Sequence, residues 1–194
     1  MANLASGKVG RISLGNGVMY MTPYIGGSAD LTSTSATQDV GYVRNGTFTV
    51  TRQKVEVRSG TPRLFLTQFA VEESATLAVA GIEWNMSRLK DLMGAGTITT
   101  SGSTDTFRFG GDLFFGFNAV KFVHQMPSGG TVILSMWKTL GQGEMTLNLG
   151  DDVHEFPYNF TAVAADTRWA AGAANAYNEK LFQLELIAPP GGFI

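Results

Sequence analysis

Cysteine is absent from this sequence of 194 residues, and histidine occurs only twice. The missing thiols exclude a disulfide framework and a thiolate zinc site. A metal site needs three or four converging ligands, and His154 shares its predicted strand face only with Asp152. His124, in another predicted strand, is expected to be a structural residue. We therefore expect no metal site.

Charged residues are scarce as well. They make up 15% of the sequence, against about a quarter in typical soluble proteins. The formal net charge of −2 excludes a strongly basic nucleic-acid-binding protein and an acidic disordered tail. Residues 1–21 contain no continuous apolar run of the length of a signal peptide or a membrane span, so we expect a soluble protein made in the cytoplasm, without membrane contact. A chain with few charges is expected to hide surface in an assembly.

Catalytic and cofactor motifs are also missing. The sequence has no Walker loop and no G-x-S-x-G elbow, and Gly141-Gln142-Gly143 lacks the third glycine of a dinucleotide fingerprint. Glu72 and Glu73 are neighbours on a predicted strand, so their side chains point to opposite faces and cannot act as a catalytic pair. We expect no catalytic residue, no cofactor and no enzyme activity.

Residues 64–94 carry the clearest pattern in the chain. Side chains alternate up to about Ala80, which predicts a single long strand. At about 3.3 Å per residue, such a strand would span on the order of 50 Å, more than a small monomer needs. One face is bulky and apolar and is expected to lie in the core: Phe65, Phe69, Val71, Ala75, Leu77 and Val79.

The opposite face of this strand is small and weakly polar, and it carries no basic residue. It is expected to form a wall in contact with water. Its polar members are Gln68, Glu72, Ser74 and Thr76.

After Gly81 the period of the apolar residues changes to that of a helix. Asn85 is suited to cap an early turn, and Gly94 stands where a helix C-terminal glycine belongs. The pattern predicts a short amphipathic helix that lies on a sheet. Its apolar stripe is Ile82, Met86, Leu89 and Met93.

The rest of the chain predicts a single mainly β domain, residues 1–194. Residues 1–16 are expected to form an N-terminal arm, and residues 24–37, 94–106 and 168–178 to form loops. The aromatic segment 107–117 is expected to be a bent strand that fills the core, or alternatively an interface plug. Further strands are expected at residues 18–21, in two adjacent segments of 47–58 that end in a turn at 59–62, and at 119–125, 131–140, 145–149, 153–165 and 181–188.

The order of these segments carries a resemblance. A long strand ending in glycine leads to a helix marked by Glu83-Trp84 and Leu89, followed by a small-residue insertion. The later segments are TVILSMWKTL (131–140), EMTLNL (144–149) and HEFPYNFTAVAADT (154–167). Together they resemble the major tail proteins, or tail tube proteins, of long-tailed bacteriophages. The closest parts are residues 39–94 and 130–166.

The resemblance implies a β-sandwich or half-barrel with one short flanking helix. Six copies would form a hexameric ring with a central β-barrel lumen, and the rings would stack into a tube around a tape-measure protein. Tail terminator and distal tail proteins would be further partners. Double-stranded DNA would pass through the bore without specific binding. The protein would assemble in the host bacterial cytoplasm and belong to the virion tail.

On this hypothesis the face with Gln68, Glu72, Ser74 and Thr76 lines the lumen, beside polar faces of residues 47–58. A passage for DNA must give its phosphates nothing to bind, and this face has no lysine or arginine. Residues 24–37 and 94–106, together with both termini, would bridge successive rings.

Two alternatives stay open at this stage. The tube of a bacterial contractile secretion system shares the architecture. A β-sandwich carbohydrate-binding module on a surface is the second, with Trp137 or Trp169 stacking on sugars, although core packing is the better interpretation of these tryptophans. An enzyme would require a cleft with converging polar groups.

Overall fold

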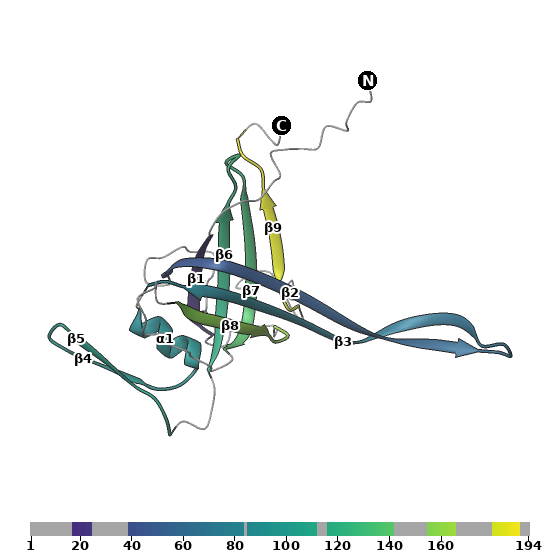
Figure 1. The fold of residues 1–194 in the computed structure, drawn as a ribbon, viewed down its shortest axis with the longest axis horizontal. Helices are drawn as coiled ribbons and strands as arrows, with labels where there is room; N and C mark the ends of the chain where they lie inside the picture. The colour runs from purple at the N-terminus through teal and green to yellow at the C-terminus, as the bar shows by residue number, and fades with distance from the viewer. Residues whose placement is uncertain are drawn as a thin grey trace.

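The computed structural model describes residues 17–24, 39–83, 85–111, 116–141, 155–165 and 180–190, which form nine strands and one helix (Figure 1). In chain order the elements are β1 (Gly17–Pro23), β2 (Asp39–Ser59), β3 (Leu64–Gly81), α1 (Met86–Met93), β4 (Thr97–Ser101), β5 (Thr104–Arg108), β6 (Phe117–Gln125), β7 (Thr131–Gly141), β8 (Phe156–Ala162) and β9 (Gln183–Ile187).

Seven strands form one antiparallel sheet in the order β6-β1-β2-β3-β8-β7-β9. An additional pairing of β6 with β7 closes six of these strands on themselves, and β9 lies outside the closure, on β7. In Figure 1, β6, β7 and β9 run steeply while β2, β3 and β8 cross them, so two layers face each other across the core. The predicted mainly β fold with one short helix is confirmed.

The core lies between the two layers and is built mainly from aliphatic, methionine and aromatic side chains. Ala75, Leu77 and Val79 of β3 are buried in it, which confirms the inner half of the predicted core face. The larger members of the cluster are Met19, Met21, Leu77, Leu89, Leu92, Leu134, Met136, Phe156, Tyr158 and Phe160.

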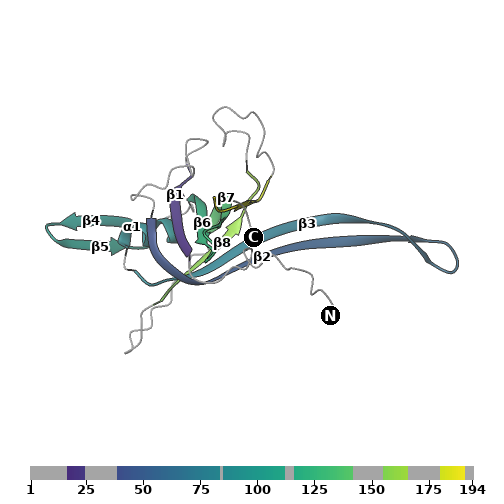
Figure 2. The ribbon, with the colours of Figure 1, turned by 90° about the horizontal axis from the view of Figure 1, so that it is seen from above.

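The prediction that the outer half of this face lies in the core is wrong. Phe65, Phe69 and Val71 are 56%, 60% and 61% exposed. They are exposed because β2 and β3 continue past the body as a two-stranded ribbon that no other described element covers (Figures 1 and 2). We call residues 52–73 of this ribbon the projecting arm, and every residue in it is exposed.

The strand β2 is also longer than predicted. Two adjacent segments were expected, but one strand of 21 residues runs from Asp39 to Ser59. It contains an extra residue between Arg44 and Thr47, where Asn45 adopts a positive φ of 56°. Such a β-bulge bends a strand without ending it. The predicted turn after β2 is confirmed at residues 60–63.

The helix α1 follows the prediction closely. The Asn85 side chain accepts a hydrogen bond from the Arg88 backbone N–H at 3.2 Å, and Gly94 ends the helix at a left-handed φ of 64°. Leu89 and Met93 of the predicted stripe are buried. Arg88 fixes the helix to the sheet, because its Nη1 donates to the Met21 carbonyl at 3.0 Å.

The prediction of an irregular loop at residues 94–106 is wrong. Residues 97–108 form the hairpin β4–β5, in which Thr97 faces Arg108 and Thr99 faces Thr106. Threonine-rich alternation suits a strand even where little is buried, and nearly all of this hairpin is exposed. Its expected position outside the core is therefore right, while its expected irregular structure is wrong.

The aromatic segment 107–117 is not one bent strand. Phe107 belongs to β5, which ends at Arg108, and its partly buried side chain packs against the core. Phe109 is exposed, and Phe117 is the first residue of β6. The predicted strands at 18–21, 119–125, 131–140 and 181–188 are confirmed, and β8 confirms part of 153–165. The N-terminal arm, residues 25–37, 145–149 and 168–178, and His154 with Asp152 lie outside the described residues.

Tyr158 gives the fold a testable response to alkaline pH. Its side chain is buried beside Phe160, and burial raises the pKa of its hydroxyl to about 12. The pKa of this hydroxyl in the folded protein exceeds its unfolded value of about 10. The contribution of Tyr158 to the free energy of unfolding is therefore complete below pH 10 and is lost as the pH rises from 10 toward 12. We expect the free energy of unfolding to fall by about 2–3 kcal/mol over this range. Urea unfolding of wild type and Tyr158→Phe at several pH values measures the difference; parallel pH profiles would contradict it.

Candidate functional site

The inner part of the β2–β3 ribbon carries a polar face. Residues directly opposite each other in an antiparallel pair share a face. Thr49 lies opposite Thr76, Thr51 opposite Ser74, and Gln53 opposite Glu72. We call this set the polar strip: Thr47, Thr49, Thr51, Gln53, Glu72, Ser74 and Thr76.

The strand β8 widens this polar surface. Thr161 lies opposite Thr76, and Asn159 lies opposite Ala78 on the same side of the sheet. Their neighbours Tyr158 and Phe160 point the other way, into the core. Hydroxyl and amide groups therefore cover three adjacent strands on the side that faces away from the core.

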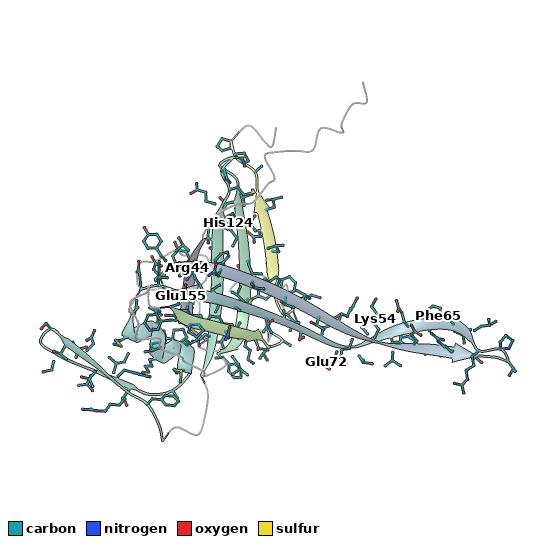
Figure 3. All side chains as sticks on the ribbon, viewed as in Figure 1. Arg44, Lys54, Phe65, Glu72, His124 and Glu155 are labelled. Carbon is teal, nitrogen blue, oxygen red and sulfur yellow. The ribbon has the colours of Figure 1, made fainter. Side chains whose placement is uncertain are left out.

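This surface offers little to a polyanion. Within the strip the one ionisable side chain is Glu72. Arg44 lies opposite Ala80 at the end of the strip, but its guanidinium forms an ion pair with Glu155 (Figure 3). Phosphate binding by counterion release requires lysines or arginines that are available to it. A nucleic acid passing this face would thus meet hydroxyls, amides and a carboxylate.

One predicted member of the face is misplaced. Gln53 pairs with Glu72 but the next residue, Lys54, pairs with Ala70, so Val71 is an extra residue in β3. An extra residue reverses which side chains point to which face beyond it. Gln68 consequently lies opposite Glu56, on the other face from Glu72. Of the predicted lumen-facing set, Glu72, Ser74 and Thr76 share a face and Gln68 does not.

The two faces of the ribbon exchange polarity where the projecting arm begins. On β2, Phe48 packs against the core, but Arg52, Lys54 and later alternate residues on that face are charged. The opposite face is polar through Gln53 and then turns apolar. We call this second set the apolar face of the arm: Val55, Val57, Leu64 and Phe69, which the register places together.

The charged face of the arm is balanced internally. Arg52 pairs with Glu73 at 2.6 Å, and Arg58 pairs with Glu56 at 2.5 Å. Both pairs are well exposed, so each contributes little to stability. Over residues 52–73 the sequence has four basic and three acidic residues, which leaves this arm nearly neutral.

An open groove lies between β2 and the β6–β7–β9 layer. Its lining is mostly apolar, from Phe48, Phe122, Val132, Leu134 and Leu184 among others. Arg44 and His124 are its ionisable lining residues within the described part of the chain. Arg44 is held by Glu155 and His124 is buried, as expected for a structural histidine. The groove does not bring together the acid and base that catalysis requires.

Sugar stacking by tryptophan does not fit the geometry. Trp137 is 5% exposed and packs with Ala119 and Ala165 in a small second core. A stacking platform needs an exposed ring, so the core interpretation of Trp137 is confirmed. Trp169 lies outside the described residues.

Within the described ranges, no three His, Asp or Glu side chains are grouped closely enough to hold a metal ion. No helix in that part of the chain is long and apolar enough to cross a membrane. No protein-family model matches the sequence, and no curated protein matches it significantly. The function is therefore inferred from the projecting arm and the polar strip.

Proposed function

We propose that this protein is a structural subunit that assembles with copies of itself into rings, and that the rings stack into the tail tube of a long-tailed bacteriophage. The observation that carries the proposal is the projecting arm, a ribbon of 22 residues (52–73) with an apolar face that no other described strand or helix covers. The resemblance of the sequence to tail tube proteins is the reason for proposing stacked rings as the form of this assembly.

An uncovered arm is not a stable end state for a single copy. A two-stranded ribbon alone is at best marginally stable in water. Within the described part of the chain, both outer edges of the arm also lack a strand partner for their backbone N–H and C=O groups, since β1 pairs only with residues 39–43 of β2 and β8 only with residues 76–81 of β3. The arm points away from the body (Figure 2), and its apolar face is opposite to the face that forms the core. Among the described residues nothing covers this face, and on the proposed function the cover comes from another copy.

The free energies of burial and association favour an assembly in which each copy makes more than one contact. Fully burying a Val, Leu or Phe side chain contributes about 1.5–3 kcal/mol. The four members of the apolar face are 38–63% exposed, so covering them contributes about 3–6 kcal/mol. Association costs about 4–15 kcal/mol in lost freedom. One arm contact is therefore barely sufficient. A head-to-tail ring gives every copy two such contacts and leaves no free end.

The charge balance supports another copy as the cover. A nearly neutral arm has no reason to bind DNA, RNA or an anionic membrane, all of which require a basic surface. The whole chain has a formal net charge of −2, so copies repel each other only weakly. An apolar face on a neutral arm is suited to an equally neutral protein surface.

In the proposed tube the polar strip lines the lumen. Six copies per ring place their strips around the bore, where a tape-measure protein lies during assembly and double-stranded DNA passes later. Tail terminator and distal tail proteins cap the two ends, and the assembled protein belongs to the virion. The absence of available positive charge on the strip supports this role, because the phosphates of passing DNA find no lysine or arginine to bind there.

Sedimentation velocity over a wide range of protein concentration tests self-assembly. We expect a shift from slowly sedimenting protomers to ring-sized and larger particles as the concentration rises. A single species of monomer mass at every concentration would contradict the proposal.

A further inference from the structure

The strand β9 has an open edge. It pairs with β7 on one side, and on its other side it has no strand partner among the described residues. Leu184, Leu186 and Ile187 are 60%, 50% and 48% exposed. An exposed edge strand with apolar side chains is a template for pairing with a further strand.

The surface behind this edge is apolar. The register places Leu184 opposite Leu134, and Leu186 opposite Val132, on one side of the layer. Leu184, Leu134 and Val132 all line the open groove. A strand added beside β9 would extend the layer and bring its own side chains next to this groove.

The arm has one edge that can supply such a strand. Its β3 edge is interrupted by two extra residues, Val71 and Leu66. Bulges of this kind protect an edge from pairing. The β2 edge continues from Thr47 to Ser59 without an extra residue, and of the described strands only β1 pairs with β2 on that side, at residues 39–43.

From these observations we infer that the β2 edge of the projecting arm of one copy pairs antiparallel with β9 of the next copy. The inference rests on the proposed self-assembly and names its contact. The register that fits best places Val55 opposite Leu184 and Lys54 opposite Glu185. Apolar side chains then meet on one face and opposite charges meet on the other.

Neighbouring registers that keep the faces fit less well. A shift by two residues in one direction places Glu56 opposite Glu185, and like charges directly opposite each other are unfavourable. A shift by two in the other direction keeps an opposite-charge pair, Arg52 with Glu185, but replaces the apolar pair by Gln53 opposite Leu184. Pairing of two arms with each other would leave the β9 edge open in both copies. The arm-to-β9 contact covers the two unpartnered surfaces at once, and it joins different surfaces, which permits a closed ring.

Disulfide trapping tests the contact and its register. The chain has no cysteine, so each introduced pair reacts alone. Directly opposite residues have Cα atoms about 4.5–5.5 Å apart, which suits a disulfide. We expect assembled Val55→Cys/Leu184→Cys protein to form a covalent ladder of copies after mild oxidation. In the matched control Val57→Cys/Leu184→Cys, the two residues are diagonal neighbours whose Cα atoms lie about 7–8 Å apart. The control should form on the order of tenfold less covalent product. Val55→Cys alone should form no dimer.

A charge exchange gives an independent measurement. We expect Lys54→Glu to shift assembly to at least about tenfold higher protein concentration, and Lys54→Glu/Glu185→Lys to restore most of it, because the exchange recreates the opposite-charge pair. If wild type assembles but the double-cysteine ladder is missing, or if Val55→Cys alone dimerises through two arms, the inferred contact is wrong and the proposed function survives. If wild type remains monomeric, both are wrong.

Discussion

Removing the projecting arm is expected to yield a folded protein that no longer assembles. Thr51 and Ser74 lie directly opposite each other at the base of the arm. Replacing residues 52–73 by Asn-Gly therefore joins them through a two-residue hairpin turn of the favoured type. Every buried core residue lies outside the deleted segment, so the body keeps its packing.

The expected magnitude is large for assembly and small for folding. Assembly should be abolished at concentrations where wild type is fully assembled, while the midpoint of thermal unfolding at low concentration should change little. Circular dichroism and size-exclusion chromatography measure the two effects. A truncated protein that still forms rings would show that the arm is dispensable.

Matched substitutions separate the apolar face from the mere presence of the arm. Val55→Ser/Val57→Ser removes apolar surface from the face that we expect to be covered. Glu56→Ser/Arg58→Ser removes one charge of each sign from the opposite face, where the two side chains form an exposed ion pair with each other. The first variant should weaken assembly by about tenfold or more, since covering these two half-exposed valines contributes about 1.3–2.7 kcal/mol and tenfold corresponds to about 1.4 kcal/mol. The second should weaken it less.

Placing lysines on the polar strip is expected to make assembled tubes retain double-stranded DNA. Thr51→Lys, Glu72→Lys and Thr76→Lys together raise the charge by four units per copy on one face of the ribbon. Each phosphate neutralised adds about 0.9 to the slope of log K against log salt. The tubes should still form, and passage of DNA through them should slow.

The location of retained DNA decides whether the strip lines a bore. DNA held in the lumen should resist nuclease and leave as the salt concentration rises. The control Gln68→Lys/Glu56→Lys puts positive charge on the opposite face, where the register places both residues. If DNA bound to the strip variant is digested as readily as DNA bound to the control, the strip does not face an enclosed lumen.

Local signals predicted the elements of this fold more reliably than their surroundings. The caps of α1, Asn85 and Gly94, and the alternation of β3 act over a few residues, so the sequence shows them directly. The exposure of Phe65 and Phe69 depends on where β1 and β8 stop pairing with the ribbon, which no local pattern records. Apolar alternation looks the same whether its cover is intramolecular or another chain.

The same limit explains the error in the candidate site. The extra residue Val71 is visible only from the pairing of β2 with β3, so the sequence placed Gln68 beside Glu72. A signal was nevertheless present in β2, which has no bulge in this region. Its odd-numbered residues change from threonines to Val55 and Val57, while its even-numbered residues change from Phe48 and Val50 to charged residues. That exchange of polarity marks the start of the arm.

Electron microscopy of the purified protein at high concentration tests the central claim most directly, namely that copies cover one another's open β surfaces by forming closed rings. We predict ring-shaped particles with a central hole, stacked into hollow tubes, that disappear when residues 52–73 are replaced by the short turn. A uniform field of compact single protomers, with no rings or tubes at any concentration, would contradict it.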